Sequence, residues 1–105
     1  MTLEDLRKLP TLQTATVAEV VKRDESTFFY IIKCLNRFFT GDYGDISEED
    51  TAANNADLKA GSGHILARYG QAYELETDIY IEAHFEEGFE GVDYNNIVIM
   101  YPSER

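Results

Sequence analysis

The amino-acid sequence predicts an α+β domain in which N-terminal helices pack on a C-terminal three-stranded antiparallel meander. Apolar residues in the first 60 positions recur at helical spacing, whereas after Gly63 they alternate with polar residues as strands require. Helices first and strands last are typical of α+β architecture. With 105 residues, 44% of them hydrophobic, the chain is expected to form one domain over residues 1–105.

The N-terminal segment contains two short candidate elements. Thr2 followed by Asp5 is typical of a helix start, and Pro10 ends the turn that follows. Residues 12–16 fit either a strand, because of their β-branched side chains, or the approach to a helix. We favour a short helix capped by Thr16.

A long helix is predicted over residues 24–40, with Asp24 as its N-cap and Gly41 as its stop. Phe28, Ile32, Leu35 and Phe39 recur at helical spacing and lie on one helical face. Apolar residues also occupy much of the remaining circumference: Phe29, Ile31, Cys34 and Phe38. A helix that is apolar on most sides is central to a core or lies at an interface.

A second helix is predicted over residues 47–60, because Ser47 and Asp50 form a variant capping box and Gly61 suits a C-cap. Its apolar content is low, so it is expected to pack lightly. The three strands of the meander are expected at residues 65–67, 77–85 and 96–101, and a glycine-rich acidic loop covers residues 86–95.

The net charge of −11 is concentrated in two blocks. Residues 1–39 carry five acids and six bases, residues 40–60 carry six acids and one base, and residues 74–94 carry eight acids and no base. A field of this sign repels nucleic acid and attracts basic surfaces. Solubility is the common reason for such acidity. The alternative interpretation is a surface that occupies a nucleic-acid-binding groove of another protein.

Motifs of familiar catalytic chemistry are absent from the sequence. There is no G-x-S-x-G nucleophile motif, and the glycine patterns of phosphate and dinucleotide loops are missing. Cys34 is the only cysteine, so an internal disulfide and a cysteine-based metal site are excluded, and its apolar surroundings predict a buried thiol. We therefore expect no enzymatic activity and no cofactor.

Two groups of polar residues offer weaker chemical signals. The acids between Asp42 and Asp50 are dense enough for a divalent cation, but their spacing does not match an EF-hand loop and a helix N-terminus explains them better. On the strand at 77–85, Glu82 and His84 would share the polar face. A general acid–base role is one interpretation of that pair, and a hydrogen-bonded strand histidine is the commoner one.

One part of the sequence resembles a known group of proteins. The motifs are G-D-Y-G-D at 41–45 with E-E-D at 48–50, then Asn54, Asn55, Asp57 and Leu58, Ile65–Tyr69, Ile79–Ala83 and Tyr101–Glu104. They are similar to short acidic proteins of plasmids and mobile elements in Firmicutes and gut bacteria, most of which have no assigned activity. The match covers roughly the final two thirds of the chain, and the loop at 86–95 is longer than in the group.

The resemblance implies an inhibitor of a host defence nuclease, because mobile elements carry such inhibitors and anti-CRISPR proteins are similar in size and charge. The expected partner is a CRISPR nuclease, in particular Cas9, bound through its basic nucleic-acid surface. Direct nucleic-acid binding is not expected. The candidate partner-binding residues are Asp42, Asp45, Glu48, Glu49, Glu82, Glu86, Glu87, Glu90, Asp93 and Tyr94.

Two alternative functions compete with inhibition. One is a mobile-element accessory protein that acts as a homodimer through the apolar helix at residues 25–39. The less favoured one is a metal-dependent hydrolase that uses Asp42, Asp45 and the acids near residue 49. The N-terminal residues carry charges where a signal peptide needs an apolar stretch, and no apolar run reaches membrane-spanning length. The expected location is therefore the cytoplasm.

Overall fold

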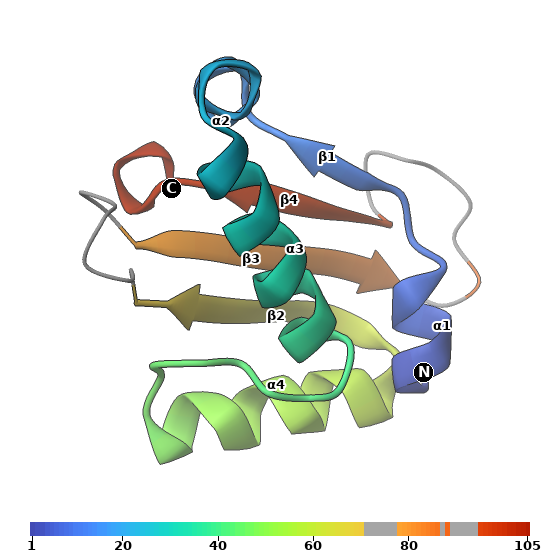
Figure 1. The fold of residues 1–105 in the computed structure, drawn as a ribbon. Coiled ribbons are helices and arrows are strands. Elements are labelled where there is room, and N and C mark those ends of the chain that lie inside the picture. The colour runs from blue at the N-terminus through green and yellow to red at the C-terminus, as the bar shows by residue number, and fades with distance from the viewer. Residues whose placement is uncertain (71–77, 87, 89–94) are drawn as a thin grey trace.

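A four-stranded mixed sheet forms the centre of the computed structural model, which describes residues 1–70, 78–86, 88 and 95–105 (Figure 1). Its order is β1-β4-β3-β2, with bounds β1 Thr11–Gln13, β2 Ser62–Tyr69, β3 Ile79–Glu86 and β4 Asn96–Met100. Strands β2, β3 and β4 form the antiparallel meander that the sequence predicts. The α+β class is confirmed, and the sheet has one strand more than expected.

The additional strand, β1, corrects the expectation for residues 12–16. Residues 11–13 pair in parallel with residues 97–99 of β4, and the Thr14 N–H donates to the Ile99 carbonyl at 3.1 Å. The short helix does form, as α2 (Ala15–Arg23), but Thr14 caps it and not Thr16. The strand forms because β4 would otherwise present an unpaired edge, and backbone groups at that edge need partners.

The remaining helices follow their local signals closely. A capping box of Thr2 and Asp5 opens α1 (Leu3–Arg7). The long helix is α3 (Glu25–Phe38) and the second is α4 (Glu48–Ala60), which ends at Gly61 with a left-handed φ of 74°. A short 3₁₀ helix, η1 (Pro102–Glu104), follows β4. Among the described residues, no helix has the length and apolarity needed to cross a membrane.

The hydrophobic core lies between α3 and the sheet face that it crosses (Figure 1). Cross-strand partners on that face are apolar, such as Ile65 with Ala83 and Ile81 with Ile99. The face predicted from spacing divides between solvent and core: Phe28 and Ile32 are exposed, whereas Leu35 and Phe39 are partly buried against the core. The buried positions of α3 are Thr27, Ile31, Cys34 and Phe38. Both sides of the helix are apolar, so spacing alone does not select the side that meets the sheet.

The Cys34 thiol is expected to be unreactive in the folded protein. The residue is 2% exposed, and burial raises the pKa of its thiol to about 11, so almost no thiolate is present at neutral pH. A thiol-specific reagent should therefore label it only after denaturant is added. Full labelling of the native protein within the mixing time would contradict this burial.

Candidate functional site

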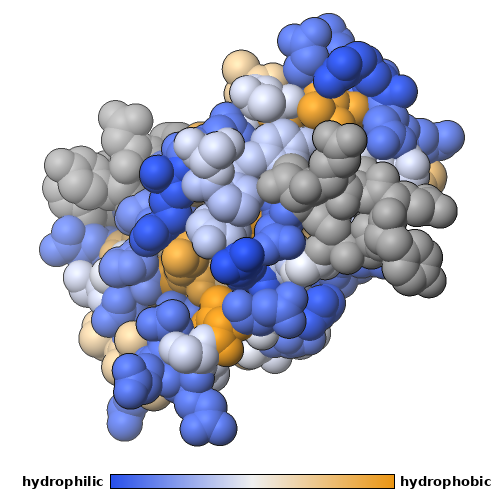
Figure 2. All heavy atoms as spheres, turned by 90° about the vertical axis from the view of Figure 1, so that its left-hand side faces the viewer, coloured by the Kyte–Doolittle hydropathy of each residue, from blue (hydrophilic) through white to orange (hydrophobic). Residues whose placement is uncertain are grey.

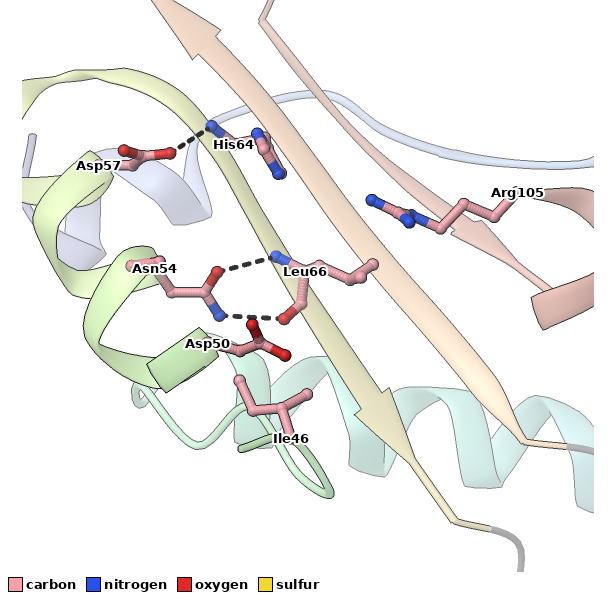
Figure 3. A pocket seen from close by; sticks show the side chains of 8 residues that line it. Ile46, Asp50, Asn54, Asp57, His64, Leu66 and Arg105 are labelled. Atoms are coloured by element: carbon pink, nitrogen blue, oxygen red, sulfur yellow. Dashed lines mark hydrogen bonds between the residues drawn. The ribbon is translucent and has the colours of Figure 1, made fainter. Parts of the chain in front are cut away.

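Helix α4 covers the outer edge of β2 with polar side chains (Figure 3). The Asn54 amide donates to the Leu66 carbonyl at 3.0 Å and accepts from the Leu66 N–H at 3.2 Å. One turn further, Asp57 accepts from the His64 N–H at 3.1 Å. These side chains occupy the place of a further strand, so this edge of the sheet is closed to strand addition.

The loop before α4 continues this cover along β2. The Asp45 N–H donates to the Arg68 carbonyl at 2.6 Å, and the Arg68 N–H donates to the Tyr43 carbonyl at 3.1 Å. The Asp45 carboxylate accepts from the Gly70 N–H at 2.8 Å. Although Asp45 is exposed and acidic, its carboxylate already holds the end of a strand.

Asp42 is likewise engaged within the chain. Arg37 donates to both of its carboxylate oxygens, at 2.8 and 3.2 Å, and the Gly44 N–H donates at 3.1 Å. The Arg37 hydrogen bond is the largest cause that lowers the pKa of Asp42. The guanidinium also lies over the ring of Tyr69, 4.9 Å from its centroid. Asp42 thus ties the loop to the C-terminal end of α3.

On the sheet face opposite α3, a row of ionisable residues surrounds Glu82. Its side chain is only 9% exposed, and one oxygen pairs with the Arg105 Nε at 3.2 Å. The other lies 3.1 Å from the His84 Nε2, so the predicted sharing of one strand face by Glu82 and His84 is confirmed. The His84 ring stacks on His64 of β2, with centroids 6.0 Å apart. A buried carboxylate needs such ion-pair and hydrogen-bonding partners.

A pocket of about 270 Å³ opens between α4 and this sheet face (Figure 3). Asp50 and Asp57 contribute carboxylates to its α4 side, and Arg105 lies across from them. The rest of its lining is formed by Ile46, Ala53, Asn54, His64 and Leu66. The lining thus combines two carboxylates and a guanidinium with the aliphatic side chains of Ile46, Ala53 and Leu66, and such a mixture of apolar surface with a few polar groups is usual in binding pockets.

The other predicted partner-binding residues fall into two groups. Glu48 and Glu49 are exposed in the first turn of α4, and Glu86 is exposed at the end of β3. Glu87, Glu90, Asp93 and Tyr94 lie outside the described residues. Figure 2 views the molecule from the side on which α4 begins, and hydrophilic residues dominate it, with hydrophobic ones confined to small separate areas.

The groups around the pocket bear on the chemical roles that the sequence raised for them. Within the described ranges, no three His, Cys, Asp or Glu side chains are grouped as a metal site would need. His84 has the carboxylate partner that a general base often uses, but His84 does not line the pocket. The pocket brings together charged groups and aliphatic surface.

Comparison of the chain with protein-family models, with curated proteins and with solved structures found no match. Four residues of the site were not among the predicted partner-binding residues: Asn54, Asp57, His64 and Arg105. The i, i+3 spacing of Asn54 and Asp57 places them on one side of α4, and this spacing is the sequence feature that could have indicated a shared role. Their pairing with a strand edge is a tertiary property, and Arg105 reaches Glu82 from 23 residues away.

Proposed function

We propose that this protein is a non-enzymatic inhibitor that docks its acidic surface on the basic nucleic-acid-binding groove of another protein. The observation that carries the proposal is the exposed carboxylates at the start of α4, beside the pocket. Asp50 lines it with a carboxylate that has no ion-pair partner among the described residues, and Glu48 and Glu49 extend the negative surface along the first helical turn. Basic side chains of a groove would find both charge and aliphatic contact here.

Some acids of this chain have partners within the fold, whereas others are exposed and can contact another protein. Asp42, Asp45 and Asp57 hold backbone or arginine partners within the fold, and Glu82 is buried beneath Arg105. The docking surface that we propose is therefore centred on residues 48–50 and the pocket. In the proposed complex, this surface faces the basic groove of the partner. The resemblance to mobile-element proteins favours a defence nuclease of the Cas9 type as that partner.

The test compares two variants that each remove two negative charges. Glu49→Gln with Asp50→Asn should weaken binding to a Cas9-type nuclease without guide RNA about 3- to 30-fold and reduce its salt dependence. Glu4→Gln with Glu19→Gln, on exposed sites of α1 and α2, should change binding less than twofold. Surface plasmon resonance at several salt concentrations measures both.

Each part of the proposal has its own contrary result. Equal weakening by both variants would assign the effect to net charge and remove α4 as the docking surface. Binding that is tight but insensitive to salt would remove the electrostatic basis. If the guide-free nuclease does not bind and a different basic protein is captured from host lysate, the proposed partner is wrong, whereas the docking surface on α4 still stands.

A further inference from the structure

Helix α3 presents an apolar surface to solvent. Phe28, Phe29 and Ile32 are 43%, 55% and 40% exposed, and no other described element lies over this side of the helix in Figure 1. The two phenyl rings pack edge to face, with centroids 5.7 Å apart. Adjacent exposed aromatic and aliphatic side chains of this size are typical of an interaction site, whereas single exposed ones are ordinary.

The charges beside this surface are arranged symmetrically about Phe29. Glu25 lies four residues before it and Lys33 four residues after it, and both are exposed on the same helix. When two copies of α3 pack antiparallel across a two-fold axis at Phe29, Glu25 of each copy lies against Lys33 of the other. A parallel arrangement would place like charges together, so the charge pattern selects the antiparallel one.

The electrostatics of the whole chain also favour this surface for self-association. Residues 1–39 contain five acids and six bases, although the chain as a whole has a net charge of −11. Two copies that approach through α3 therefore meet through a nearly neutral part of the sequence. A small domain also hides excess apolar surface efficiently by pairing with itself.

We infer that this protein forms an isologous homodimer in which α3 packs antiparallel against α3 of a second copy, with Phe29 at the centre and Glu25–Lys33 ion pairs at both sides. The dimer presents two copies of the pocket beside α4, because that pocket lies on the opposite side of the sheet from α3. The inference is independent of the proposed inhibitor function, since it concerns the chain without any partner.

Sedimentation equilibrium tests the dimer with a matched pair of substitutions. The wild-type chain should dimerise with a dissociation constant on the order of micromolar. Phe29→Glu should weaken dimerisation at least about 30-fold, because it places two carboxylates at the centre of the contact. Leu12→Glu alters a residue of similar exposure, 44%, on β1 and should leave the constant within about twofold.

A charge exchange tests the antiparallel register. Glu25→Lys alone and Lys33→Glu alone should each weaken the dimer about three- to tenfold, and the double exchange should restore it. Failure of the double exchange to restore the dimer would overturn the register. A wild-type chain that stays monomeric at about millimolar concentration would overturn the dimer. If Phe29→Glu then abolishes binding to the nuclease, the surface belongs to that partner and not to a second copy.

Discussion

Asn54→Leu should destabilise the protein by about 2–4 kcal/mol, because it removes both hydrogen bonds that the side chain makes to Leu66. Asn54 is 5% exposed, so the N–H and carbonyl of Leu66 would lose their partners in a place that water reaches poorly. The midpoint of thermal unfolding should fall by roughly 10–20 °C for a domain of this size. Urea denaturation followed by circular dichroism measures the free energy of unfolding.

Asn55→Leu is the matched control, since Asn55 is the next residue of α4 and is exposed. Both substitutions increase helix propensity by a similar amount, so the difference between them reports the contact with β2. The control should change the free energy of unfolding by less than about 0.5 kcal/mol. If the two variants are equally stable, the Asn54 amide does not support the strand edge.

The role of Asn54 explains how a helix with few apolar residues stays on the sheet. Because α4 contributes mainly alanines and Leu58 to packing, its position depends on the hydrogen bonds from Asn54 and Asp57 to β2. These bonds also shield the edge strand from other chains. Loss of Asn54 should therefore promote aggregation as well as unfolding, and light scattering during the same denaturation experiment would detect it.

Local signals in the sequence are sufficient to predict helix α4. Ser47 caps the helix through the Asp50 N–H at 3.1 Å, and Gly61 ends it with a left-handed backbone. These features depend on residues within one turn of each other, so the sequence predicts the helix within one residue at its start. The meander was predictable for a similar reason, since alternation along β3 reports the sheet directly.

Long-range contacts explain the features that the sequence did not disclose. Strand β1 has three residues, and its pairing with β4 joins positions more than 80 residues apart, such as Thr11 and Ile97. The orientation of α3 is a second case: both sides are apolar, and only the position of the sheet buries Ile31 and leaves Phe29 in solvent. Neither property is encoded in local spacing.

The acidic block after α3 shows why charge alone is a weak guide to a site. Among its acids, Asp42 binds Arg37 and Asp45 binds the Gly70 N–H, whereas Glu48 and Glu49 are exposed in the first turn of α4. All four look alike in the sequence. Three-dimensional contacts divide them into acids that hold the fold and acids that can meet a partner, and the proposed docking surface follows from that division.

Gly44→Ala should destabilise the protein by about 3 kcal/mol or more, through two effects that act at one residue. Gly44 has a φ of 75°, a conformation that costs a residue with a Cβ about 1 kcal/mol. An added Cβ would also overlap the Arg68 carbonyl oxygen and approach the Tyr69 ring to 2.8 Å. Because the oxygen belongs to the backbone of β2, the overlap is relieved only by moving the loop away from the strand.

Gly41→Ala separates the two effects, since Gly41 has a similar φ of 84° but its added Cβ would meet only Leu3 at an ordinary 3.6 Å. It should lose about 1 kcal/mol, the cost of the backbone conformation alone. The excess loss in Gly44→Ala then measures how firmly the loop is held to Arg68. Equal losses in urea denaturation would mean that the loop moves freely, and Asp45 would then be available to a partner after all.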